Sequence, residues 1–240
     1  MYPRNYWLKR HCMSLILHID TAQESGYVSL ALEGRVIAER YSTGTREHAS
    51  FLHTAIASLF TEQNIAPAAI QAVAVSAGPG SYTGLRIGMS AAKGICYALQ
   101  KPLICINTLE LMAADALAQI RQSGAITSFF ICPMIDARRM EVFTAVYDQC
   151  LNIESAPCAA LVEPAFLDSY LSHVPVYFTG SGSVKWEKMS KSTRAVFLPN
   201  TYNFEIINEL AYEYFIHSRF EPLQYVEPFY CKDFYSSTRE

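Results

Sequence analysis

Two short segments place a carboxylate where a predicted strand turns. Asp20 and Thr21 close one apolar run, and Asp136 closes another just before Arg138 and Arg139. In such turns, hydroxyl and backbone N–H groups can hold a phosphate, and a carboxylate can hold a hydrated cation. The structural alternative is that the carboxylates cap their own turns. In the same way, the two arginines either pair with Asp136 or face an anionic partner, and the sequence leaves this open.

The segment SAGPGSYTGLRIG, residues 76–88, carries the strongest signal. A predicted strand enters its Gly-Pro-Gly loop and a predicted helix leaves it, so the N-terminus of that helix offers free N–H groups to an anion. The segment is neither a P-loop nor the dinucleotide-binding fingerprint. With the glycines that follow a later strand, the candidate phosphate-loop residues are Asp20, Thr21, Gly78, Gly80, Ser81, Asp136, Gly180 and Gly182.

One face of the predicted helix after this loop consists of small residues. Gly84, Gly88 and Ala92 recur at a spacing of four. Because glycine inside a helix costs about 1 kcal/mol relative to alanine, something is expected to pack very close to this face. The sequence allows either the chain's own sheet or a helix of a second subunit.

No catalytic or metal-binding residues are predicted. His48 and His53 are five residues apart, which places them roughly 140° apart around a helix. The chain has seven cysteines but no Cys-x-x-Cys pair. It also lacks a Gly-x-Ser-x-Gly elbow and a recognisable Ser/His/Asp order.

Alternation and apolar runs predict the elements that must position these groups. Expected strands cover 15–19, 27–32, 36–41, 70–75, 103–106, 129–135, 141–147 and 174–179. Expected helices cover 48–63, 83–100, 108–122 and 204–219, whereas 157–164 is expected to be a loop. The strand–Asp–turn–strand theme occurs twice, at Asp20 and at Asp136. This favours a duplicated α/β fold with a cleft between two halves.

Composition and charge narrow the class of protein. Hydrophobic residues make up 51% of the chain and charged residues 17%, which excludes intrinsic disorder. No apolar run reaches the ~18–20 residues of a membrane span. The net charge is −3, and without the basic residues 1–12 the body carries −6. Such a body is a poor nucleic-acid binder alone. Cys96, Cys105 and Cys132 lie in apolar runs and predict a reduced, cytoplasmic protein.

Several motifs together resemble the TsaB (YeaZ) family over residues 14–232. They are Ile19-Asp20-Thr21-Ala22, Arg46-Glu47-His48, the segment from Gly78 to Gly88, Ile135-Asp136-Ala137-Arg138, and Val226-Glu227-Pro228 with Tyr230. The resemblance implies an actin/hexokinase-like (ASKHA) fold, a duplicated ribonuclease-H-like fold of two subdomains. The expected divisions are an N-terminal subdomain 13–108, a connecting helix region 109–126 and a C-terminal subdomain 127–232, with helix 204–219 packing back on the first. Residues 1–12, an over-called start or a basic arm, and the tail 233–240 fall outside it.

The resemblance implies a non-catalytic, cytoplasmic scaffold that activates TsaD, a transferase that places a threonylcarbamoyl group on the adenosine beside a tRNA anticodon. A TsaE-like ATPase joins this complex, a homodimer is an alternative state, and tRNA is reached only through the complex. TsaD relatives carry a metal-binding His-x-x-x-His, whereas Thr108 and Met112 stand at those positions here. Neither residue can replace an imidazole as a ligand of that site.

The resemblance also implies that helices 48–63 and 83–100 meet the partner. The expected contacts are Leu52, Ile56, Leu59, Gly84, Leu85, Gly88, Met89 and Ala92. No cofactor is required, although ATP or ADP could bind at the phosphate loops. Two departures matter: Ala22 replaces the glycine of active actin-like ATPases, and Arg139-Met140 stands where the family often has glycine. The alternatives are a glycoprotease-like peptidase and a stand-alone nucleotide-binding module.

Overall fold

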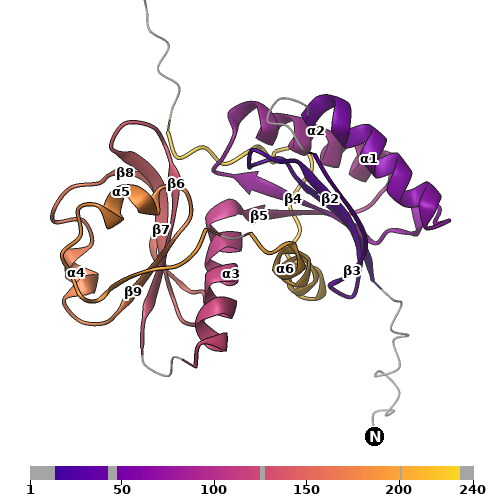
Figure 1. The fold of residues 1–240 in the computed structure, drawn as a ribbon. Helices are drawn as coiled ribbons and strands as arrows, with labels where there is room; N and C mark the ends of the chain where they lie inside the picture. The colour runs from indigo at the N-terminus through magenta and orange to yellow at the C-terminus, as the bar shows by residue number, and fades with distance from the viewer. Residues whose placement is uncertain (1–13, 43–47, 125–127, 201, 233–240) are drawn as a thin grey trace, which may run out of the picture.

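The computed structural model describes residues 14–42, 48–124, 128–200 and 202–232. These residues form two five-stranded sheets with helices packed between and outside them (Figure 1). None of the helices in these ranges is long and apolar enough to cross a membrane.

The first sheet, sheet A, has the strand order β3-β2-β1-β4-β5. Its strands are β1 Leu15–Asp20, β2 Tyr27–Leu32, β3 Arg35–Tyr41, β4 Ala72–Gly78 and β5 Leu103–Asn107. The first three form an antiparallel meander, and β4 and β5 add in parallel beside β1. The meander and the buried parallel strand at 70–75 were both predicted from apolar patterning, and both predictions are confirmed.

The second sheet, sheet B, repeats this topology with the order β8-β7-β6-β9-β10. Its strands are β6 Phe130–Asp136, β7 Glu141–Asp148, β8 Ile153–Leu161, β9 Val176–Thr179 and β10 Ala195–Phe197. Here too, the first three strands are antiparallel and the last two are parallel. Because strand order and direction agree pair by pair, the fold is duplicated, as the two strand–Asp–turn–strand segments predict.

Helices cover both faces of sheet A. The outer face packs on α1 His48–Glu62 and α2 Tyr82–Leu99, while α3 Thr108–Gln122 and α6 Phe204–Ile216 lie on the side facing sheet B (Figure 1). A serine or asparagine side chain caps three of these four helices: Ser81 caps α2, Asn107 caps α3 and Asn203 caps α6. Each side chain accepts an N–H that the helix itself leaves unpaired.

The C-terminal half departs from the predicted elements. The expected loop at 157–164 is wrong, because β8 extends through Leu161 and pairs with β7. Pro157 hid this strand, yet proline is tolerated on an edge strand, where one side of the ladder is free. Sequence patterning also missed three short elements that pack on or extend sheet B. They are α4 Asp168–Leu171, α5 Ser183–Glu187 and β10.

Candidate functional site

Asp20, the first candidate phosphate-loop residue, is buried and already bonded within the chain. Its side chain lies at the carboxyl end of β1, and the residue is 1% exposed. One carboxylate oxygen accepts the N–H of Ala22 at 2.8 Å, and the other accepts the Tyr202 hydroxyl at 2.5 Å. Burial and the charge of Asp20 raise the pKa of Tyr202 well above its usual value, so the hydroxyl stays a donor. Tyr202 therefore closes this turn, and no short-range sequence signal links residues 182 positions apart.

The small-residue face of α2 packs on the same turn. The Thr21 hydroxyl donates to the Gly84 carbonyl at 2.7 Å, and a methyl group at Gly84 would overlap the Thr21 carbonyl oxygen. A methyl group at Gly88 would overlap the Thr21 hydroxyl, and one at Gly80 would overlap the Ala22 carbonyl. The glycines thus allow α2 to lie against this chain's own β1–β2 turn. The neighbour that packs against the small-residue face of α2 is therefore a part of this chain, the β1–β2 turn.

The loop at Gly78 is covered by the C-terminal segment. Gly78 has a φ of +109°, and a methyl group there would overlap the Phe229 carbonyl. The Phe229 N–H donates to the Ala77 carbonyl at 2.7 Å. Ser81 is also engaged, because its side chain caps α2 and its N–H donates to the Ala22 carbonyl at 2.8 Å. The Ser81 N–H and side chain, two of the groups predicted to bind phosphate, therefore bond within the chain.

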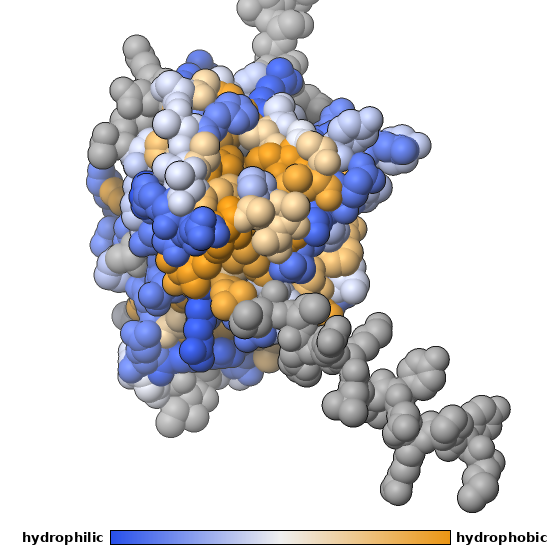
Figure 2. Space-filling view, turned by 90° about the vertical axis from the view of Figure 1, so that its right-hand side faces the viewer, coloured by the Kyte–Doolittle hydropathy of each residue, from blue (hydrophilic) through white to orange (hydrophobic). Residues whose placement is uncertain are grey.

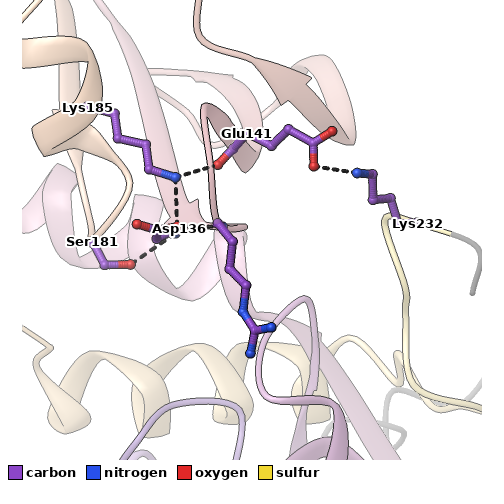
Figure 3. A network of polar contacts seen from close by, with 6 residues as sticks. Asp136, Glu141, Ser181, Lys185 and Lys232 are labelled. Carbon is purple, nitrogen blue, oxygen red and sulfur yellow. Dashed lines mark hydrogen bonds and ion pairs between the residues drawn. The ribbon is translucent and has the colours of Figure 1, made fainter. Parts of the chain in front are cut away.

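The matching turn in sheet B is open to solvent. The Asp136 side chain is 45% exposed and pairs with the Lys185 ammonium at 2.7 Å (Figure 3). The hydrogen bond from Lys185 lowers the pKa of Asp136 below its usual value, although partial burial opposes it. Asp136 also accepts the N–H of Arg138 at 2.6 Å, and its own N–H donates to the Ser181 hydroxyl. Asp136 therefore forms its ion pair with Lys185, and no described ion pair joins it to the side chain of Arg138 or Arg139.

The glycines after β9 lie at positions where neighbouring atoms leave no room for a side chain. Gly180 has a φ of +93° and lies against Met112 and the Met134 carbonyl, where a methyl group would overlap both. The Gly182 N–H donates to that same carbonyl at 2.9 Å. A cavity of about 530 Å³ lies between the two halves, and none of the eight predicted phosphate-loop residues lines it. Its lining includes Glu24, Ser25, Tyr41, Ser181, Tyr202 and Phe204.

The positions that match the metal-binding histidines of TsaD relatives are buried at the start of α3. Thr108 is 0% exposed, and its hydroxyl has no hydrogen-bond partner among the described residues. Met112 is 7% exposed. In the described ranges, no group of three or more His, Cys, Asp or Glu side chains could hold a metal ion.

The predicted partner contacts are buried within the chain, and their role at an interface stays a prediction. All eight are buried inside this chain, on or beside the faces of α1 and α2 that pack against sheet A and the β1–β2 turn, and Ile56 also lines the groove between the two helices: Leu52, Ile56, Leu59, Gly84, Leu85, Gly88, Met89 and Ala92. The apolar stripe of a helix marks its core side, and helix spacing alone could not separate core from interface. Leu85 is 1% exposed, so Leu85→Glu is expected to unfold the chain, not merely to block association.

An apolar groove lies between these two helices. A cavity of about 800 Å³ is lined by His53, Ile56, Ala57, Phe60, Thr61, Asn64, Ile65, Ala66, Pro67, Ile95, Ala98 and Leu99. It contains no Asp, Glu, Lys or Arg. Figure 2, which views the molecule from the right-hand side of Figure 1, shows hydrophobic residues gathered in a patch on this side. A second cavity of about 670 Å³ shares His53 and continues the groove toward Tyr82 and Arg86.

Comparisons with known proteins converge on one family. The chain matches the family model of TsaD, tRNA N6-adenosine threonylcarbamoyltransferase, over residues 35–204. The tRNA threonylcarbamoyladenosine biosynthesis protein TsaB of Bacillus subtilis is 35% identical over 55% of this chain and 54% of that protein. The protein of the same name from Escherichia coli is 27% identical over 91% of this chain and 94% of that protein.

Two solved structures share the fold across nearly the whole chain. One is a Pseudomonas aeruginosa protein described as similar to the peptidase YEAZ, with a TM-score of 0.75 and 24% identity over 92% of this chain and all of that one. The other is YeaZ from Pseudomonas aeruginosa, with a TM-score of 0.69 and 26% identity over 91% of this chain and all of that one.

Proposed function

Because the chain belongs to the TsaD family and, within it, to the TsaB (YeaZ) group, we propose that it is the non-catalytic partner of a TsaD-like transferase. Its relatives are named for tRNA threonylcarbamoyladenosine biosynthesis, and the chain acts in that pathway. Its role there is to bind the transferase and hold it in its active form. The two subunits meet at the groove between α1 and α2.

The observation that carries this proposal is the uncharged groove. A cavity of about 800 Å³ on the outer face of a helix pair, lined by no Asp, Glu, Lys or Arg side chain, is unusual for a surface that stays in water. Apolar helix grooves of this kind accept apolar side chains of a partner helix. A paralogue with the same fold presents a helix pair of the same kind, which makes a pseudo-symmetric contact favourable.

A non-catalytic role is supported by the residues at the family's metal position. Thr108 and Met112 offer a buried hydroxyl and a thioether, neither of which replaces the two imidazoles. The peptidase alternative requires a nucleophile and a base within hydrogen-bonding reach. Among the described residues that line the cleft, no serine is hydrogen-bonded to a His, Asp, Glu or Lys side chain. Peptide hydrolysis by the pure protein, abolished by a single substitution, would restore that alternative.

Nucleotide binding is the second candidate, and the cleft argues against it. The turns at Asp20 and Asp136 already bond to Tyr202 and Lys185. A phosphate would have to displace these partners together with the contacts of α2 on Thr21. We therefore propose that the chain requires no ATP or ADP. Calorimetry with ATP at high micromolar protein is expected to show no binding heat, and a saturable heat would contradict this.

The other partners follow from the same proposal. A TsaE-like ATPase joins the assembled pair, and tRNA is engaged through the complex. The homodimer uses the same groove and competes with the transferase for it. The acidic body of this chain makes tight tRNA binding by the isolated subunit unfavourable.

The decisive experiment places a charge in the groove without disturbing the core. Ala57 and Ala98 line the groove and are exposed, so Ala57→Glu and Ala98→Glu should fold normally. Each is expected to weaken association with the transferase at least tenfold, because a carboxylate would be buried against an apolar surface. Thr54→Glu is the matched control, since Thr54 is exposed on α1 but lies outside the groove.

Solution mass of the mixed subunits and activity of the reconstituted complex are the two readouts. The wild-type chain and the Thr54→Glu variant should form a 1:1 pair and support tRNA modification, whereas the groove variants should lose both. Full activity of the transferase without this chain would sink the scaffold role. Intact pairing by both groove variants would show that the partner binds elsewhere.

A further inference from the structure

The tip of the β6–β7 hairpin carries two arginines whose charges are not neutralised by the neighbouring acids. Asp136 is paired with Lys185, and Glu141 is paired with Lys232 from the C-terminal segment (Figure 3). Lys185 also donates to the Glu141 carbonyl at 2.9 Å, which ties both pairs into one network. The two lysines thus neutralise both acids next to the tip.

The net positive charge of this tip comes from Arg138 and Arg139. Both residues are exposed, and neither guanidinium forms a hydrogen bond or ion pair with any residue in the described ranges. Only backbone groups of Arg138 are engaged, with its N–H bonded to Asp136 and its carbonyl accepting the Glu141 N–H at 3.1 Å. The tip therefore presents two adjacent, fully available cations.

The backbone at these arginines is held in an unfavourable conformation. Arg138 has a φ of +70° and Arg139 a φ of +48°. This left-handed region favours glycine and asparagine, and the resemblance leads one to expect a glycine at this turn. Non-glycine residues held in such regions cluster where a side chain is needed in a particular place. This turn carries two arginines at positions whose backbone conformation a glycine would adopt with less strain.

The equivalent turn in the other half shows that the charge is local. Between β1 and β2 the turn carries Gln23, Glu24 and Ser25, with a net charge of −1, whereas the β6–β7 tip carries +2. The body as a whole is negative. A polyanion that touches this molecule is therefore attracted at this tip and repelled by most of the remaining surface.

We propose that Arg138 and Arg139 contact phosphates of the tRNA when it is bound to the assembled complex. This inference rests on the proposed function, which supplies a polyanionic substrate. A guanidinium matches a phosphate with two parallel N–H···O bonds, and two arginines in sequence can reach consecutive phosphates of one strand. Such contacts orient the RNA and read no sequence. They suit a subunit that contributes to tRNA affinity without taking part in the chemistry.

The test measures tRNA affinity of the reconstituted pair over a range of KCl concentrations, using an unmodified tRNA transcript. The double variant Arg138→Gln/Arg139→Gln is expected to weaken binding roughly tenfold near 0.1 M salt, and to make the slope of log K against log salt shallower by about 2. Arg138→Lys/Arg139→Lys keeps both charges and should keep the slope. Arg35→Gln is the control, because Arg35 is an exposed arginine at the β2–β3 turn, at the opposite end of sheet A from the cleft.

Subunit association, followed by solution mass, separates the two proposals. If the double glutamine variant pairs normally but its tRNA affinity and salt slope equal those of the wild type, the RNA contact is refuted while the scaffold role stands. If the variant loses the transferase instead, the tip binds an acidic protein surface and the RNA proposal is overturned. If the wild-type chain does not pair at all, the proposed function fails and this inference fails with it.

Discussion

The two halves share one strand framework, yet their equivalent turns are built in opposite ways. In sheet A, Asp20 is buried, bonded to Tyr202, and covered by an α2 of 18 residues. In sheet B, Asp136 is exposed and paired with Lys185, and the matching helix α5 has only 5 residues. In the half that contains sheet A, the turn is buried by internal packing, and the groove lies on the outer face. The other keeps its turn at the surface and presents charge.

This difference shows how one strand framework can present two different kinds of surface. The close packing of α2 on Thr21 fixes the helix that forms one wall of the groove. Because those contacts occupy the turn at Thr21, a ligand could reach this turn only if α2 moved away from it. In the second half, the helix that directly follows β9 is α5, which has only 5 residues, and the turn at Asp136 stays at the surface.

The largest effect is expected from filling the close contact in the first half. Gly84→Ala would push a methyl group into the Thr21 carbonyl, and we expect a loss of about 3 kcal/mol in the free energy of unfolding. Gly94→Ala on the same helix meets no atom within 4 Å and should stabilise the protein by up to about 1 kcal/mol. Urea denaturation of both variants measures this. Equal stability of the two would show that α2 does not need this close approach.

The next prediction concerns a histidine that sheet B lacks. Burial lowers the pKa of His18 from 6.5 to about 4, although the charge of Asp20 raises it. The unfolded chain therefore binds a proton that the native chain does not, and stability falls as the pH drops from 6.5 toward 4. The loss is about 3 kcal/mol over this window.

Met134 occupies the equivalent position in sheet B, two residues before the turn aspartate, and provides the control substitution. His18→Met is expected to remove this acid sensitivity and to raise stability near pH 5, since both ring nitrogens of His18 lack partners among the described residues. Chemical denaturation at a series of pH values tests this. An unchanged pH profile in the variant would mean that His18 does not titrate in this range.

A direct comparison of the two turns comes from removing the partner of each aspartate. Tyr202→Phe leaves a carboxylate oxygen of Asp20 buried without that donor, and should cost about 2 kcal/mol. Lys185→Met breaks an ion pair whose carboxylate is 45% exposed, and should cost less than about 1 kcal/mol. Thermal and urea unfolding give both values. Equal costs would contradict the distinction between a closed and an open turn.

The smallest effect is expected at the strained hairpin tip. Arg139→Gly relieves a left-handed residue and should stabilise the chain by about 1 kcal/mol, reduced by the greater freedom of glycine in the unfolded state. Arg35→Gly in the strand β3 provides the contrast and should destabilise. If Arg139→Gly destabilises as well, the arginine side chain contributes to folding and the strain argument is wrong.

Local pattern was enough for most of the fold, and particular residues show why. The apolar alternation of β1 to β3 and the buried run of β4 depend only on which residues face the core. The helix starts expected at residues 108 and 204 agree with the structure, in which Asn107 and Asn203 cap the two helices. Where local signals conflict, pattern fails: Pro157 disguises an edge strand, and the short helices of sheet B have too few turns for a period.

The site could be predicted only in part. The sequence determined that Asp20 and Asp136 end equivalent strands, that a glycine face on α2 allows close approach, and that no imidazole stands at Thr108 or Met112. These properties follow from residue type and spacing along the chain. They were sufficient to suggest a duplicated fold and its family.

Tertiary structure alone decided what those residues contact. Tyr202 donates a hydrogen bond to Asp20. Lys185 forms an ion pair with Asp136, whereas the sequence suggested the two neighbouring arginines as possible partners. Leu85 and Leu52 point to the core, so the groove belongs to other residues of the same helices, such as Ala57 and Ala98. The apolar stripe of a helix can be recognised in its sequence, but the stripe looks the same whether the core or a partner covers it. Only the packed chain shows which side chains remain at the surface.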